Sequence, residues 1–263
     1  MMLPEQRRQE ILRYVNEKRK ANVNELAEVF QASPNTIRRD LSILSQRGQV
    51  TRTHGGIIAN NFYYEMSDFS YMERASQYLT EKRKIGRAAA QLIGEGETVI
   101  IDFGTTALEV ARHLSHLKNC TILTSSLSVA TELVTYSPQV TVHLSGGTVN
   151  SKINGLIGPV AESFYSQVHA DKLFLSVAGM EISRGLVSSN WFEVNIKRAM
   201  IQQCNECILL LPNYRLGNKG LVVFSDITPV NKVITDMPLP AEYQAFFDRR
   251  QIEVIIADDE GTK

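Results

Sequence analysis

The stretch Ser33-Pro34-Asn35-Thr36-Ile37-Arg38-Arg39-Asp40-Leu41 decides how the first part of the chain folds. Ser33 is a typical residue for the N-cap of a helix, and Pro34 suits the first helical position. Gly48 is a typical C-terminal stop. Between these signals the apolar residues recur at steps of four and three, which predicts one apolar face along a short helix: Ile37, Leu41 and Leu44.

The opposite face of this predicted helix is polar and basic, and it carries Asn35, Arg38, Arg39 and Ser42. In the major groove of DNA, Arg bonds bidentately to guanine and Asn to adenine. An ordinary amphipathic surface helix has the same pattern, so this helix alone leaves both interpretations open.

A strand and a turn follow the helix. Residues 50–53 are strand-like and His54-Gly55-Gly56 is a turn signal, which together predict a small basic wing. In the DNA-binding interpretation, the helix reaches base edges or phosphates and the wing touches the backbone. The predicted DNA-binding residues are Ser33, Pro34, Asn35, Thr36, Arg38, Arg39, Ser42, Arg52, Thr53, His54 and Gly55.

Two further helices are predicted upstream, at 4–18 and at 25–30, the second capped by Asn24. A tight turn at 31–33 then leads into the third helix, which is the helix-turn-helix arrangement. Residues 1–57 contain ten Lys or Arg and six Asp or Glu, whereas the whole chain carries 28 of each sign. The first part is therefore basic and the remainder acidic, which predicts that only the first part binds nucleic-acid phosphate.

A length of 263 residues favours two domains. We expect a winged helix-turn-helix domain at 1–57, a connector at 58–80 and a larger α/β domain at 81–263, which binds an effector and forms oligomers. The connector is rich in aromatic residues, which favours packing on a neighbouring domain or subunit over a loose tether. These residues are Phe62, Tyr63, Tyr64, Phe69, Tyr71 and Tyr78.

From residue 81 onward, continuous apolar strands alternate with helices, which predicts a parallel sheet covered on both faces. Ligands of such sheets bind beyond the carboxyl ends of the strands. Glycine, serine and threonine follow three successive predicted strands, and such turns bind anions through backbone N–H groups and hydroxyls. The candidate residues are Asp102, Gly104, Thr105, Thr106, Thr124, Ser125, Ser126, Gly146 and Gly147. No nucleotide-binding motif of the P-loop or dinucleotide type is present.

The remaining global features favour a cytosolic protein. No stretch of 18 apolar residues occurs, and the beginning of the sequence is charged. Cys204 and Cys207 have the spacing of a redox or metal site, but no second pair or nearby His accompanies them. We therefore expect them to pack at a helix end and in a strand, with no metal bound.

The motif at 36–41, with His-Gly-Gly at 54–56 and Val23-Asn24-Glu25-Leu26-Ala27 upstream, resembles the DeoR/GlpR family of bacterial sugar-metabolism repressors. The resemblance extends over nearly the full chain. It implies that the larger domain is similar in fold to ribose-5-phosphate isomerase and glucosamine-6-phosphate deaminase and binds a phosphorylated sugar as inducer. It also implies that Gly104, Thr105 and Thr106 hold the phosphate, while Glu193 and Lys197 face the sugar.

The sequence departs from the family pattern at three candidate positions. Ser125 stands where the family usually has Asn, and Pro212 removes a carboxylate. Arg215 replaces the usual Lys, which keeps a positive charge for an anion. An unusual ligand such as a sugar-acid or alditol phosphate fits these changes, and so does a weakened site. For Glu193 and Lys197, the alternative interpretation is an exposed i,i+4 pair on a helix.

A phosphosugar isomerase or deaminase with an added DNA-binding domain is the alternative function. Such chemistry needs a general base near the sugar, for which Glu193 or Glu181 are the candidates. Ala178 and Pro212 stand where carboxylates are expected, which argues against it. We expect a repressor without catalytic residues or cofactor, with double-stranded operator DNA and a phosphorylated sugar derivative as partners and no membrane contact. Palindromic operators predict a homodimer or homotetramer.

Overall fold

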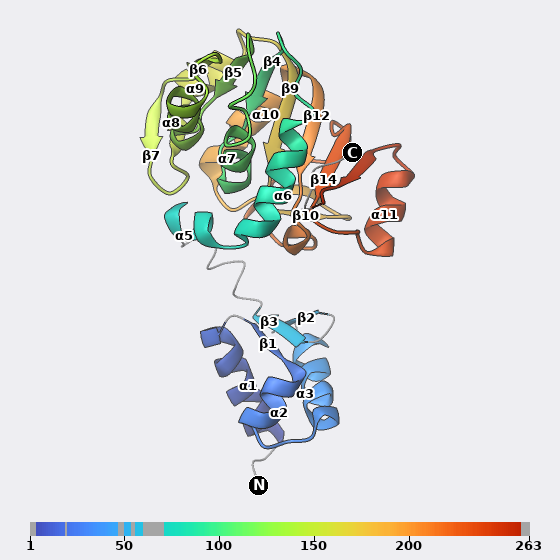
Figure 1. Cartoon of the computed structure of the whole chain (residues 1–263). Helices are drawn as coiled ribbons and strands as arrows, with labels where there is room; N and C mark the ends of the chain where they lie inside the picture. Colours follow the sequence, from blue (N-terminus) through green and yellow to red (C-terminus); the bar gives the residue numbers. More distant parts are fainter. Residues whose placement is uncertain (1–3, 19, 47–49, 54–55, 60–70, 259–263) are drawn as a thin grey trace. The chain divides into compact units, whose positions relative to one another are not determined.

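The computed structural model describes residues 4–18, 20–46, 50–53, 56–59 and 71–258 (Figure 1). The chain divides into two compact units, Met1–Asp68 and Phe69–Lys263. The domain boundaries expected at 57 and 80 stay predictions. No helix within the described ranges combines the length and the apolar content needed to cross a membrane.

The first unit contains helices packed against a small antiparallel sheet of order β1-β3-β2. Its core includes the predicted stripe of the third helix, with Ile37, Leu41 and Leu44 all buried. The winged helix-turn-helix fold is thereby confirmed. The elements are α1 (Pro4–Lys18), β1 (Lys20–Asn22), α2 (Val23–Val29), α3 (Pro34–Gln46), β2 (Val50–Thr53) and β3 (Gly56–Ala59).

The predicted cap of the second helix is wrong by two residues. Asn22, and not Asn24, is the N-cap of α2, because its side chain accepts a bond from the backbone N–H of Glu25 at 2.8 Å. The Glu25 carboxylate in turn accepts from the Asn22 N–H at 3.2 Å. This reciprocal capping box satisfies two unpaired donors at once, so the helix begins at Val23.

The second unit is built on a parallel sheet of order β15-β14-β12-β9-β4-β5-β6. Helices α6 to α8 bury apolar residues against one face, and α9 to α11 against the other, which confirms the predicted architecture. The strands are β4 (Thr98–Ile101), β5 (Thr121–Thr124), β6 (Thr141–Leu144), β9 (Ala170–Ser176), β12 (Cys204–Leu210), β14 (Lys232–Thr235) and β15 (Glu253–Ile256). The helices are α6 (Leu79–Ala90), α7 (Thr105–Ala111), α8 (Leu127–Tyr136), α9 (Pro159–Tyr165), α10 (Val194–Gln202) and α11 (Ala241–Asp248).

Short antiparallel strands lie outside the parallel sheet and were not among the predicted elements. Each has three or four residues, too few for a period of two to be recognised in the sequence. They are β7 (Thr148–Asn150) paired with β8 (Gly155–Ile157), and β10 (Gly179–Glu181), β11 (Gly185–Ser188) and β13 (Val222–Ser225) in one sheet. Cys207 is buried in the core on β12, and Cys204 packs against the same core, as expected from the sequence.

The expected connector contains regular structure at its end. Helix α5 (Tyr71–Ser76) falls within it, and α6 begins at Leu79, before the end of the connector expected at residue 80. Tyr71 is buried in the second unit, and the ring of Tyr78 stacks on that of Tyr214 with centroids 4.0 Å apart. Packing of these two aromatic residues agrees with the prediction, whereas Phe62, Tyr63, Tyr64 and Phe69 lie outside the described residues.

Candidate functional site

The order of the strands reverses direction between β4 and β9. From β4 the chain proceeds through β5 and β6 to one edge of the sheet, and from β9 through β12 and β14 to the other. Ile101 pairs in register with Phe174, so the carboxyl ends of β4 and β9 lie side by side. Ligands of doubly wound sheets bind at this kind of switch point.

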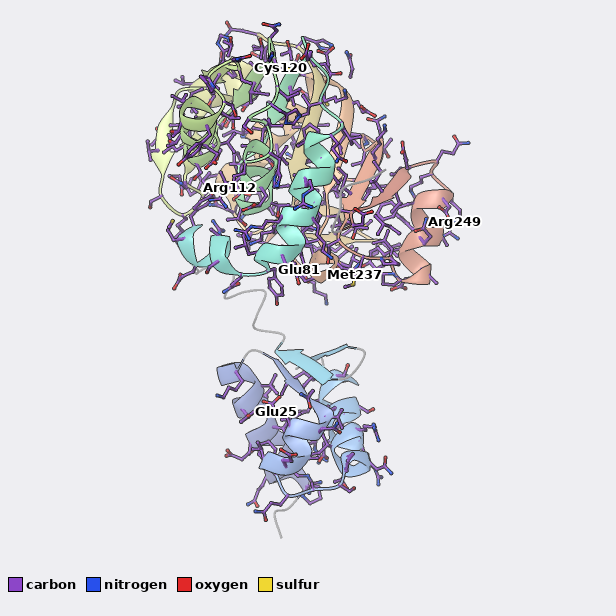
Figure 2. The ribbon with its side chains drawn as sticks, in the orientation of Figure 1. Glu25, Glu81, Arg112, Cys120, Met237 and Arg249 are labelled. Carbon is purple, nitrogen blue, oxygen red and sulfur yellow. The ribbon has the colours of Figure 1, made fainter. Side chains whose placement is uncertain are left out.

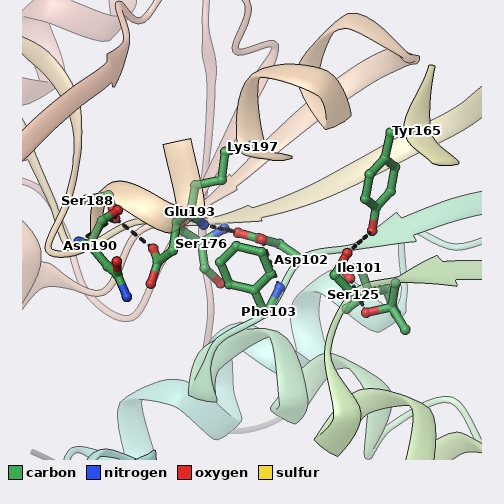
Figure 3. Close-up of polar contacts among 11 residues, drawn as sticks. Ile101, Asp102, Phe103, Ser125, Tyr165, Ser176, Ser188, Asn190, Glu193 and Lys197 are labelled. Carbon is green, nitrogen blue, oxygen red and sulfur yellow. Dashed lines mark hydrogen bonds and ion pairs between the residues drawn. The ribbon is translucent and has the colours of Figure 1, made fainter. Parts of the chain in front are cut away.

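A buried ion pair occupies the switch point (Figure 3). Asp102, directly after β4, is fully buried and pairs with the ammonium of Lys197 on α10, whose side chain is only 2% exposed. The same carboxylate accepts bonds from the N–H groups of Ser176 at 2.9 Å and Phe103 at 2.8 Å. Burial raises the pKa of Asp102, and Lys197 opposes that shift. The pair ties two strand ends and a helix together.

Glu193 and Lys197 do not form the exposed i,i+4 pair that the sequence left open. Both are buried, and the Lys197 ammonium bonds to Asp102 and, at 2.8 Å, to the carbonyl of Ser176. Glu193, in the short helical turn η1 (Trp191–Glu193), instead accepts a bond from the hydroxyl of Ser188 at 2.7 Å. Figure 3 shows the Glu193 carboxylate beside the Asp102–Lys197 pair. The site therefore contains the carboxylate of Glu193 next to an Asp102–Lys197 ion pair whose two charges cancel.

Of the three predicted polar turns, the turn after β4 is the one that lies beside a polar group available to a ligand. Gly104 has a φ of 134°, which favours glycine, and a Cβ there would lie 3.3 Å from the Ser176 hydroxyl oxygen. That hydroxyl is buried and has no partner among the described residues. Thr105 and Thr106 follow and are also buried. An unpaired buried hydroxyl is a group that a ligand can satisfy.

The turn after β5 uses its hydroxyls within the protein. Thr124 donates to the carbonyl of Ile101 at 2.7 Å, and Ser126 caps α8 by accepting from the N–H of Val129 at 3.2 Å. Ser125 donates to Ser145 at 2.9 Å and also bonds to the hydroxyl of Tyr165. All three hydroxyls form hydrogen bonds within the protein, so we assign these side chains to the edge of the site.

The remaining candidates in the second unit take up two different roles. Gly146 and Gly147 have φ of 72° and 113°, and a Cβ on Gly147 would lie 2.6 Å from the carbonyl oxygen of Ile157. Their observed role is therefore a tight turn after β6. Arg215, in the helical turn η2 (Asn213–Arg215) that follows β12, donates to the carbonyl of Ala178 at 2.9 Å. This contact keeps a cation at the carboxyl edge of the sheet.

In the first unit, α3 presents the predicted polar face. Asn35, Arg38 and Arg39 are exposed, and the hydroxyl of Ser33 accepts from the N–H of Thr36 at 3.2 Å, which confirms the predicted N-cap. The Asn35 side-chain oxygen accepts from Arg38 at 2.9 Å, so the two groups are held next to each other. Arg52 and Thr53 lie in β2, whereas His54 and Gly55 fall outside the described residues.

Sequence reasoning missed the role of Asp40. This residue is 3% exposed and pairs with Arg7 at 2.6 Å and Arg8 at 3.2 Å, both on α1. Its negative charge is thereby removed from the exposed face of α3. The sequence signal was the Arg7-Arg8 dipeptide, whose pairing with an acidic residue 32 or 33 positions later is not visible in a local pattern.

Two family profiles match the chain. The DeoR-like helix-turn-helix domain covers residues 7–62, and the DeoR C terminal sensor domain covers residues 77–237. The chain belongs to the DeoR family. It is therefore a DNA-binding transcriptional regulator that carries a sensor domain.

Individual relatives of this DeoR-family chain agree over its length. It is 30% identical to the HTH-type transcriptional repressor CsqR of Escherichia coli, over 97% of this chain and 96% of the relative. It is also 30% identical to the Escherichia coli glycerol-3-phosphate regulon repressor, over 95% of this chain and 97% of that one. Among solved structures, it is similar to ribose 5-phosphate isomerase A of Methanocaldococcus jannaschii, with 15% identity and a TM-score of 0.39 over 52% of this chain and 54% of that chain.

The DeoR sensor match includes the polar residues at the switch point. Ser176, which the sequence did not single out, lies among them. Its signal was positional, because it is the last residue of a central strand beside the reversal of strand order.

Proposed function

We propose that this protein is a transcriptional repressor whose operator affinity is lowered when a phosphorylated sugar or sugar derivative binds the second unit. The observation that carries the proposal is the occurrence, in one DeoR-family chain, of an exposed Asn35–Arg38 face on α3 and a buried polar site at the switch point. The names of the relatives support both halves, since one is a repressor of a glycerol-3-phosphate regulon.

The proposed ligand contacts follow from the groups that remain available. The backbone of Gly104, Thr105 and Thr106 and the unpaired Ser176 hydroxyl are positioned to meet an oxyanion or polyol. Glu193 accepts sugar hydroxyls with the oxygen that Ser188 does not use. The domain limits 1–57, 58–80 and 81–263, a cytoplasmic location and a homodimer or homotetramer are part of the same proposal. Two-fold symmetry suits paired operator half-sites.

An isomerase or deaminase function has less support. Its candidate bases are already engaged, because Glu193 accepts from Ser188 at 2.7 Å and Glu181 pairs with Arg184 at 3.0 Å. The additional carboxylates that such chemistry would use are missing, because Ala178 and Pro212 stand where carboxylates are expected. The named relatives are regulators, so we propose a non-enzymatic sensor.

Fluorescence anisotropy on labelled DNA from the protein's own upstream region tests this function. The titration uses fixed salt and excess competitor DNA, followed by a panel of sugar, alditol and sugar-acid phosphates. We expect sequence-preferring binding that one compound reverses. Binding to upstream DNA no tighter than to random DNA would remove the proposed repressor function, and the same panel would then be assayed for turnover.

A further inference from the structure

The two outer strands of the parallel sheet differ in how their free edges are protected. Among the described strands, β6 and β15 each have one neighbour in this sheet, so each presents a row of unpaired backbone groups. Figure 2 shows Arg249 at the β15 edge, where α11 lies beside that strand. Charged side chains discourage a free edge from pairing with another chain, and residues 248–258 supply five of them: Asp248, Arg249, Arg250, Glu253 and Asp258.

The edge formed by β6 has almost no charge. Residues 133–170 supply β6, β7, β8 and α9, and the charged side chains in these 38 positions are Lys152 and Glu162. Charged residues make up 21% of the whole chain, so a stretch of this length would carry about eight. The strand itself, residues 141–144, contains neither lysine nor proline, which protect many free edges. Depletion of charge is typical of the core of a protein–protein interface.

The backbone of β6 offers hydrogen bonds on its outer side. The N–H groups of Thr141 and Ser145 donate toward β5, to carbonyls at 2.9 and 3.0 Å. Backbone groups alternate between the two sides of a strand, so the N–H and C=O groups of Val142 and Leu144 point away from β5. Four polar groups therefore face outward at this edge.

On one face of the sheet, α9 and the end of β6 enclose a groove of about 630 Å³. Ser145 lines it from the strand, and α9 lines it with residues three and four positions apart, which share one side of a helix: Val160, Ser163, Phe164 and Gln167. Val160 is 62% exposed. This side of α9 is therefore open to solvent next to the free edge.

On the other face, α8 exposes an apolar residue toward the same edge. Glu132, on α8, pairs at 3.7 Å with Arg112, the C-cap of α7, so this side of α8 faces α7. Val134 follows two residues later, about 200° around the helix, and points away from α7. Because α7 packs on β4 and α8 packs on β6, that direction leads to the free edge. Val134 is 69% exposed.

We propose that a second copy of this chain docks on the β6 edge, with the two β6 strands paired antiparallel across a two-fold axis. The proposal assigns a contact surface to the homo-oligomer that is part of the proposed function, and it rests on that function. An axis at His143 uses all four outward groups, because Val142 then pairs with the partner's Leu144, and Leu144 with the partner's Val142. The two His143 side chains lie opposite each other in this register, with Cβ atoms about 4.5–5.5 Å apart.

Two properties of the edge favour a second copy over another partner. A two-fold axis brings like charges near the axis together, and a surface with almost no charge avoids that repulsion. Pairing of four-residue strands alone is also too small, since a stable complex buries about 800 Å² on each partner. Continuing the sheet across the axis brings α8 and α9 against their counterparts, which covers Val134, Val160 and Phe164. A lone extended peptide would cover the strand and one groove and leave the other helix exposed.

The test is the mass of the full chain in solution, measured by sedimentation velocity. The wild type should be a dimer or a tetramer. Leu144→Lys places a charge at the edge, so it should halve that mass at micromolar concentration and raise the dissociation constant at least tenfold. Ile256→Lys is the matched control, because Ile256 is 43% exposed on β15 and Leu144 is 40% exposed on β6. It should keep the wild-type mass, and circular dichroism verifies that both variants are folded.

Cross-linking measures the proposed register independently. His143→Cys brings two thiols together at the axis, so mild oxidation with diamide should give a disulfide-linked dimer on a non-reducing gel. Ala245→Cys, at an exposed position on α11, should give no more dimer than the wild type with its three native cysteines.

A monomeric wild type would overturn the proposal, and so would a Leu144→Lys variant that keeps the wild-type mass. Operator binding measured on the same samples separates this proposal from the proposed function. A wild type whose mass depends on Leu144 but which shows no operator preference retains the docking surface and loses the repressor function. Operator binding that an effector reverses, in a protein whose mass does not depend on Leu144, retains the repressor and removes this surface.

Discussion

Lys197 on α10 and Asp102 at the end of β4 form a buried ion pair, and the carbonyl and N–H groups of Ser176 bond to its two members. The pair joins a helix to the two strands at the switch point. Taking both charges out of water costs free energy that their attraction recovers only if further hydrogen bonds satisfy them, and here the N–H groups of Phe103 and Ser176 do so.

Asp102→Asn should destabilise the second unit by about 3–5 kcal/mol, because it leaves the Lys197 ammonium buried without a counter-charge. Urea unfolding followed by circular dichroism measures the change. The double variant Asp102→Asn/Lys197→Met should recover part of the loss, since no unpaired charge remains. A loss below about 1 kcal/mol in the single variant would mean that the pair contributes little to the fold.

Arg38→Ala should weaken operator binding by about 1–3 kcal/mol if Arg38 contacts a guanine, because one bidentate contact is lost. The structure places Arg38 on the exposed face of α3, held next to Asn35 at 2.9 Å. Anisotropy on operator and on random DNA at one salt concentration measures both affinities. An equal loss on both would show that Arg38 meets only phosphate, and Arg184→Ala, in the second unit, serves as the control.

Thr105→Asp should leave operator affinity unchanged and abolish release by the effector. Thr105 is 9% exposed in the turn after β4, so a carboxylate there repels an anionic ligand at short range with little screening. Thr105→Asn has a similar size without the charge and should retain release at a higher effector concentration. Normal release of the aspartate variant would place the phosphate elsewhere in the unit.

The sequence predicted best those helices and strands that are long enough for their hydrophobic periodicity to be recognised. The stripe Ile37, Leu41 and Leu44 and the apolar parallel strands follow directly from local pattern, because burial repeats with the geometry of the element. The position of the polar turns at the carboxyl edge followed from the same pattern, since parallel strands end together.

The pairings within the site could not be predicted in the same way. Lys197 and Asp102 are 95 positions apart, and only the strand order brings them together. The four-residue spacing of Glu193 and Lys197 indicated a pair on one helix. In the fold, Glu193 instead accepts a bond from Ser188, and Lys197 pairs with the buried Asp102. Lys82 shows the same limit, because in sequence it is one of several charges on a helix and in the fold it is buried beside Arg74 and Tyr78.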